Sequence, residues 1–328
     1  MQTLIENTRA YRLLKAECEN ERFSHAYLLL MDDARNLRAA LKAFAKLFFH
    51  CGNPKTEREK TLSDRIDAEN FSDCLFFPDA DKKFVVDDAE KVIEESVLKP
   101  VESNKKVFVI GDFAEANPAS QNKLLKMLEE PPENVVFLLG ATTVFPVLPT
   151  VLSRVEKLEI LPFEPAPIVA ALSRIYAGKP YAETDFELVA AASGGSLGAA
   201  QNMLEGGDYK ALVDDAFSLC LCMGATLPPL VKRIGETKRK KELLFLLRVI
   251  FRDALVLRSV SGAKPMLRSE TARITKAAEK YTDSSLVFAQ ERISKAEKEV
   301  FFNAFFPQCL EVLISDILLE NAKSKRRQ

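Results

Sequence analysis

The sequence predicts an α/β domain with a parallel sheet, followed by helical domains. Three observations lead to this prediction. Short apolar runs alternate with amphipathic helical patterns as far as residue 163, and this alternation favours a parallel sheet. The runs, such as Ala26 to Met31, are apolar throughout, as in strands buried on both faces. After the proline-rich segment 162–167, only helical patterns follow.

The length of 328 residues suggests two or three domains. We place the boundaries at the proline-rich segment and at Gly206-Gly207. The predicted domains are therefore an α/β domain over 1–163, a small helical domain over 164–207 and a larger helical domain over 208–328. The hydrophobic fraction of 47% suits ordinary cores, and the net charge of -1 by itself predicts neither a nucleic-acid-binding nor a membrane protein.

The first domain is expected to contain elements in the following order. Helical spacing over 4–22 precedes the first strand, and the next helix covers 35–49. The polar segment within 51–83 is interpreted as an insertion. The remaining elements are a short strand at 84–86, a helix over 87–98, the strand "VFVIGD", a helix from Pro118 to the Pro131-Pro132 stop, the strand "VVFLLGATT" and the strand "LEIL" at 158–161.

Ligands of parallel sheets bind beyond the carboxyl ends of the strands. That rule directs attention to the segment 31–36, to Asp112 and to Thr142-Thr143. Asp112 could hold magnesium as a Walker B acid does. Its neighbour is Phe113 rather than the glutamate that an ATPase uses to polarise water. A capping or solvated carboxylate is therefore the favoured interpretation.

The turn after the first strand has the frame of a phosphate loop without its chemistry. Such loops need glycines, a lysine for the β- and γ-phosphates and a hydroxyl for magnesium. Asp32 and Asp33 would in addition repel a triphosphate. The residues at the three glycine positions, the lysine position and the hydroxyl position are Met31, Ala34, Asn36, Leu37 and Arg38. ATP binding is not expected there.

Neither a metal site nor a membrane span is predicted. Cys51 and Cys74 lack the paired C-x₂-C spacing of a structural zinc site. Six cysteines without a signal peptide favour reduced thiols and a cytoplasmic protein. The longest apolar run, 135–152, is interrupted by prolines and so does not suit a spanning helix.

Two basic segments allow two interpretations. "KRKK" at 238–241 and the tail "KSKRRQ" are either solvated surfaces or contacts to a phosphate backbone or an acidic partner. Arg154 likewise lies in a polar gap between an apolar segment and a strand. Taken alone, it favours a surface salt bridge with Glu156.

Taken together, several segments resemble the delta-prime subunits of the bacterial DNA polymerase III clamp loader, within the AAA+ superfamily. The "NKLLKMLEEPPEN" and "SRV" pieces are the most specific, and most of the matches lie in the first 165 residues. The matching segments are "FSHAYLLL" at 23–30, "VVDDAEKVIEESVLKPVESNKKVFVIGD" at 85–112, "ASQNKLLKMLEEPPENVVFLLGATT" at 119–143 and "LSRVEKLEILPF" at 152–163.

This resemblance implies an AAA+ ATPase-like domain, a helical lid and a helical collar in a ring of subunits that uses ATP to place a sliding clamp on primed DNA. The family's SRC motif falls on Ser153-Arg154-Val155, so Arg154 would reach into a neighbour's ATP site as a trans arginine finger. Thr142 falls on the first sensor position. Many relatives carry a four-cysteine zinc module, of which only Cys51 and Cys74 remain, so the zinc is expected to be lost.

The resulting prediction is a subunit with no ATPase activity of its own within the DNA polymerase III holoenzyme. Its expected partners are the gamma/tau motor subunits, the delta subunit and, through the complex, the sliding clamp and primed DNA. No cofactor is expected. Two alternatives stay open: a self-contained AAA+ ATPase with an unusual loop, and a degenerate AAA+ scaffold in DNA recombination or repair.

Overall fold

The computed structural model describes residues 1–79, 82–207, 209–260 and 262–326. The chain divides into two compact units, Met1–Pro162 and Phe163–Gln328. The first is an α/β unit, and the described part of the second is helical. The predicted order of an α/β domain followed by helices is thereby confirmed. The further division of the second unit at residue 207 stays a prediction.

The first unit is built on a five-stranded parallel sheet in the order β2-β3-β4-β1-β5. The central strand β1 pairs with β4 on one side and with β5 on the other. Its apolar residues are nearly all buried, because helices cover both faces of the sheet. The strands are β1 (Ala26–Met31), β2 (Cys74–Phe77), β3 (Lys106–Asp112), β4 (Val135–Ala141) and β5 (Glu156–Ile160).

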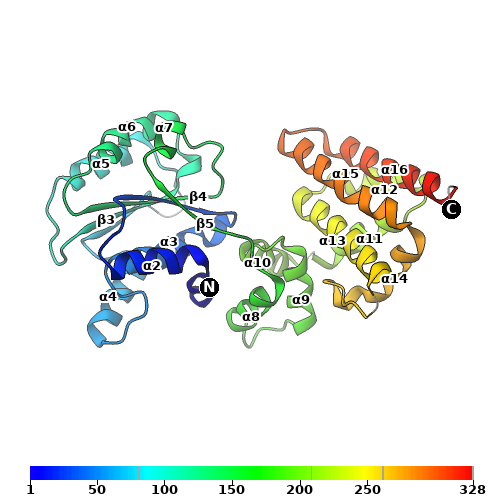
Figure 1. Cartoon of the computed structure of the whole chain (residues 1–328), viewed down its shortest axis with the longest axis horizontal. Coiled ribbons are helices and arrows are strands. Elements are labelled where there is room, and N and C mark those ends of the chain that lie inside the picture. The colour runs from blue at the N-terminus through cyan, green and yellow to red at the C-terminus, as the bar shows by residue number, and fades with distance from the viewer. Residues whose placement is uncertain (80–81, 208, 261, 327–328) are drawn as a thin grey trace. The chain divides into compact units, whose positions relative to one another are not determined.

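Helices α5, α6 and α7 lie on one face of this sheet, and α3 lies on the other (Figure 1). The helix α3 comes close to β4, since a Cβ on Gly140 would lie 2.7 Å from Leu41 Cδ1. The helices of the unit are α1 (Gln2–Glu6), α2 (Arg9–Glu19), α3 (Ala34–Phe48), α4 (Glu57–Asp67), α5 (Val86–Ser96), the 3₁₀ turn η1 (Phe113–Glu115), α6 (Pro118–Glu129) and α7 (Pro149–Leu152).

The segment 51–83, in which the sequence showed a polar insertion without clear periodicity, contains regular secondary structure. Within it, α4 begins with a capping box in which the Thr56 hydroxyl accepts from the Glu59 amide. The segment also contains the edge strand β2, which pairs with β3. The strand predicted at 84–86 is wrong: Phe84 is buried among apolar side chains, and α5 begins at Val86.

The second unit consists of packed helices (Figure 1). The long helix α15 packs against both α13 and α16. The helix α10 ends at Gly206 and is capped by Gly207, which has a left-handed φ of 69° that suits glycine. The elements are α8 (Pro165–Ile175), α9 (Glu183–Ala192), α10 (Leu197–Gly206), α11 (Tyr209–Leu221), η2 (Gly224–Thr226), α12 (Leu227–Ile234), α13 (Lys240–Ser259), η3 (Arg268–Glu270), α14 (Thr271–Lys280), α15 (Asp283–Phe301) and α16 (Phe306–Lys325).

Candidate functional site

The turn between β1 and α3 is capped by the chain's own carboxylate. Asp33 is the N-cap of α3, and its side chain is buried. Its two oxygens accept from the Asn36 amide nitrogen at 3.1 Å and from the Asn36 side-chain Nδ2 at 2.9 Å. A helix N-terminus is where proteins bind phosphate. Here an internal anion already occupies that position.

Leu37 and Arg38, at the lysine and hydroxyl positions of a phosphate loop, make contacts within the first unit instead. Leu37 is 2% exposed, so its side chain belongs to the core of the unit. Arg38 binds Glu69 through two parallel hydrogen bonds, with Nε at 2.7 Å from Oε1 and Nη2 at 2.5 Å from Oε2. It also donates to the Pro78 carbonyl at 3.0 Å. Arg38 therefore fastens α3 to the segment 69–78.

The remaining loop positions follow the same pattern. Met31 is 3% exposed at the end of β1. Ala34 is the first residue of α3, and Asn36 is bonded to the capping Asp33. A charge network supports this end of α3: Lys42 pairs with Glu69 at 2.9 Å, and the bond from Arg38 is the main cause that lowers the pKa of Glu69 to about 2.

Asp112 and Thr142, which lie 30 residues apart in the sequence, meet at the carboxyl edge of the sheet. The Thr142 hydroxyl donates to Asp112 Oδ2 at 2.9 Å, and the Thr142 amide donates to Oδ1 at 3.2 Å. The Ala114 amide also donates to Oδ1, at 3.3 Å. The Asp112 carboxylate therefore fixes the loop after β4 against the end of β3, as a capping carboxylate would.

Arg154 follows the short helix α7, in a surface turn of the first unit. Its Nη1 donates to the Thr150 carbonyl at 2.7 Å and to the Ser153 hydroxyl at 3.0 Å. Its Nη2 binds the Glu129 carboxylate at the end of α6. The salt bridge expected with Glu156 is thus formed with Glu129 instead. The side chain is 31% exposed, so it can be reached from outside the chain.

Arg154 and the Asp33 cap come from different elements of the unit. Arg154 follows α7 on the α5–α7 side of the sheet, whereas Asp33 begins α3 on the opposite side. Among the described residues, the Arg154 guanidinium is bonded to Glu129, Thr150 and Ser153. A nucleotide that contacts Arg154 would therefore be held by groups outside this turn.

The cysteine pair Cys51 and Cys74 lies in the interior of the first unit. Both are buried, and burial is the main cause that raises the pKa of the Cys51 thiol to about 11 and also raises that of Cys74. Metal ligation requires the thiolate, which such surroundings disfavour. In the described part of the chain, no three His, Cys, Asp or Glu side chains form a group that could hold a metal ion.

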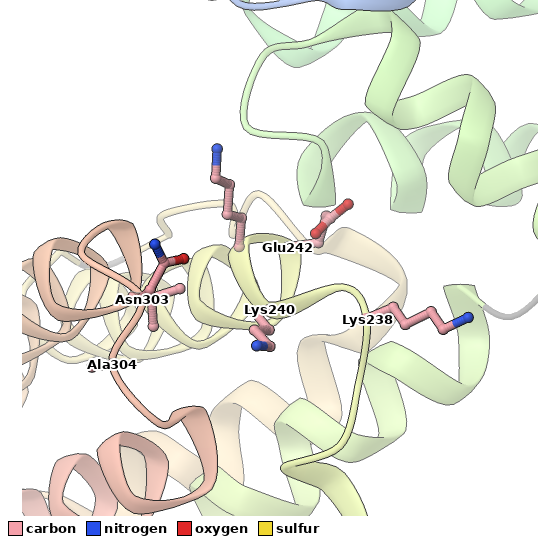
Figure 2. A pocket seen from close by; sticks show the side chains of 7 residues that line it. Lys238, Lys240, Glu242, Asn303 and Ala304 are labelled. Carbon is pink, nitrogen blue, oxygen red and sulfur yellow. The ribbon is translucent and has the colours of Figure 1, made fainter. Parts of the chain in front are cut away.

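The basic segment 238–241 borders a pocket of about 440 Å³ in the second unit. Figure 2 shows that the side chains of Lys238 and Lys240 point in different directions rather than toward one point. Lys240 lies over the Phe306 ring at 5.7 Å. The lining residues are Lys238, Lys240, Lys241, Glu242, Val300, Asn303 and Ala304. The end of the basic tail, 327–328, lies outside the described residues.

The helices give no sign of a membrane span. Among the described residues, none of them combines the length and the apolar character that crossing a bilayer requires.

Comparison with known proteins shows sequence similarity between the first unit and subunits of DNA polymerase III. Residues 6–164 match the family model described as DNA polymerase III, delta subunit. The chain is 31% identical over 204 residues to DNA polymerase III subunit gamma/tau of Mycobacterium tuberculosis, covering 54% of this chain and 35% of that protein. It is 30% identical over 165 residues to DNA polymerase III subunit delta' of Bacillus subtilis, covering 49% of each protein.

The chain thus spans about a third of the gamma/tau relative and about half of the delta' relative. Among solved structures, a gamma-subunit-related protein of Thermotoga maritima aligns over 94% of this chain and 98% of its own, with 18% identity and a TM-score of 0.40. The sequence matches confirm the predicted resemblance: residues 6–164 match the DNA polymerase III delta-subunit family model, and the chain is similar in sequence to gamma/tau and delta' subunits of DNA polymerase III.

Proposed function

We propose that this chain is a non-hydrolysing stator subunit of the DNA polymerase III clamp loader. In this role it binds no ATP of its own and donates Arg154 to the ATP site of a neighbouring motor subunit. The observation that carries the proposal is the contrast between two positions. A buried carboxylate caps the helix where phosphate would bind, while a surface arginine stands where the family's SRC motif falls.

Electrostatics supports the absence of a bound nucleotide. A triphosphate at the start of α3 would lie against the carboxylate of Asp33, without a lysine to offset the repulsion. Displacing Asp33 would break both of its bonds to Asn36. Asp112, the position of the magnesium ligand, already accepts three hydrogen bonds from the loops around it.

The chemistry of phosphoryl transfer supports the role of Arg154. An arginine supplied in trans stabilises the charge that develops on the transferred phosphoryl group, and this contributes about 10³–10⁵ in rate where it has been measured. Ser153 accepts a hydrogen bond from Arg154 and so helps to place its guanidinium. The proposed partners are the gamma/tau motor subunits and the delta subunit, and through them the sliding clamp and primed DNA in the cytoplasm.

Equilibrium binding of a fluorescent ATP analogue with magnesium tests the first part of this proposal. The isolated chain is expected to show no saturable binding at concentrations that saturate its motor subunit. The motor subunit measured under the same conditions is the positive control. Mixing the chain with motor and delta subunits and measuring the mass of the product tests the second part. A failure to assemble would contradict the stator role.

One observation favours a second candidate, a motor subunit with its own ATP site. The match to gamma/tau is longer than the match to delta', at 204 against 165 residues, with similar identity. Saturable, magnesium-dependent ATP binding by the isolated chain would select this candidate. The leucine at position 37 and the Asp33 cap predict the opposite result.

A further inference from the structure

The guanidinium of Arg154 is already held by acceptors within the first unit. Both hydrogens of Nη1 are used, one by the Thr150 carbonyl and one by the Ser153 hydroxyl. Nη2 binds Glu129, and Nε is buried without a hydrogen-bond partner in the described part of the chain. Apart from the buried hydrogen of Nε, only one hydrogen, on Nη2, is left without an acceptor among the described residues. A phosphate held through two parallel hydrogen bonds would therefore have to displace an internal acceptor.

Glu129 is the charged one among these three acceptors. It is the last residue of α6, where the negative end of the helix dipole disfavours a carboxylate. The positive charge of Arg154 offsets this repulsion. The carboxylate is 47% exposed and the arginine 31% exposed. Ion pairs that are open to solvent in this way contribute little to stability and are readily exchanged.

From this geometry we infer that Glu129 is a positioning residue that keeps Arg154 docked against α6 until a nucleotide-bearing neighbour arrives. The inference rests on the proposed function of Arg154. Glu129 and the terminal phosphate of the neighbour's nucleotide compete for the same guanidinium. A neighbour without nucleotide meets an arginine whose charge is already neutralised, so its docking leaves no unpaired charge buried. Arg154 therefore leaves Glu129 and contacts the neighbour only when that neighbour holds a nucleotide.

A charge-matched pair of variants tests this inference. Glu129→Gln keeps the size of the side chain and removes the charge that holds Arg154. Glu130→Gln makes the same change at the next position, which makes no contact with Arg154 among those that the structure gives. Binding of the full chain to its isolated motor subunit is measured with magnesium and a non-hydrolysable ATP analogue, and again without nucleotide.

We expect Glu129→Gln to tighten binding about two- to fivefold with the analogue, as suits the loss of an exposed competing pair. Without nucleotide the same variant should weaken binding, because Arg154 then brings an unpaired charge to the interface. Glu130→Gln should behave as the natural chain in both conditions. In an Arg154→Ala background, Glu129→Gln should have no effect, because the group for which carboxylate and phosphate compete is gone.

The inference is overturned if Glu129→Gln and Glu130→Gln bind alike with the analogue, or if Glu129→Gln weakens binding in both conditions. In either case the function of Arg154 can still stand, because it is read separately from Arg154→Ala. If Arg154→Ala leaves nucleotide-dependent binding and hydrolysis unchanged, the proposed function fails, and the role of Glu129 fails with it.

Discussion

Asp33, Asp112 and Arg154 each form hydrogen bonds or ion pairs with neighbours within the first unit. The sequence directed attention to these positions, because strand ends and motifs can be recognised from local patterns. It did not predict their partners. Glu129 lies 25 residues from Arg154 and Glu69 lies 31 residues from Arg38. Such contacts depend on how the helices pack rather than on spacing along the chain.

Glu69 gives a pH-dependent prediction at this scale. The bonds from Arg38 and Lys42 lower its pKa in the folded protein from 4.5 to about 2. A lowered pKa means that the contribution of Glu69 to stability is present above the unfolded value and is lost as the pH falls toward the folded value. Glu69→Gln should therefore lower the free energy of unfolding at neutral pH, by about 1–3 kcal/mol.

Denaturant unfolding of the natural chain and of Glu69→Gln between pH 7 and pH 2 measures this effect. The difference between the two chains should shrink below about pH 4.5. Glu19→Gln is the control, because Glu19 is 61% exposed in a pair with Lys15 whose atoms are 3.9 Å apart. A difference for Glu69→Gln that stays constant down to pH 2 would contradict the account.

At the scale of elements, the helix α3 keeps the place of a phosphate-loop helix and packs against β3 and β4. The long buried strands were predictable, since short continuous apolar runs that alternate with helical patterns favour strands of a parallel sheet. The strand β2 and the helix α4 were not. The strand is four residues long with a partly exposed pattern, and the helix buries only Ser63 and Ile66. Their sequence periodicity is correspondingly weak.

Gly140 supplies a test of the close packing between α3 and β4. Its Cβ position lies 2.7 Å from Leu41 Cδ1, and Leu41 is fully buried. Gly140→Ala should therefore force Leu41 or the helix to move and should destabilise the unit by about 1–3 kcal/mol. Thermal or denaturant unfolding followed by circular dichroism measures the change.

Gly111→Ala on the neighbouring strand β3 is the matched control. The nearest atom to its added Cβ is the Phe77 carbonyl oxygen at 3.5 Å, an ordinary van der Waals contact. This variant should unfold close to the natural chain. Equal losses of stability in the two variants would show that the cost comes from replacing a strand glycine as such rather than from contact with α3.

At the scale of the whole molecule, the chain joins an α/β unit to a helical unit. The first unit carries the family match and the candidate site. Sequence reasoning identified the fold class because strands and helices differ in the period of their apolar residues. The lid and collar within the second unit are proposals from the resemblance, because helices of similar length and composition carry little information about which of them pack together.

The central claim is that Arg154 completes the ATP site of a neighbour, and single-turnover hydrolysis by the reconstituted clamp-loader complex tests it most directly. With Arg154→Ala, ATP hydrolysis at the site that faces this chain should slow by about 10³-fold or more. The fast phase of product formation should then lose the amplitude that this one site contributes. Arg154→Lys should restore little of it, since an ammonium lacks the planar fork. An unchanged fast amplitude in a fully assembled Arg154→Ala complex would contradict the account.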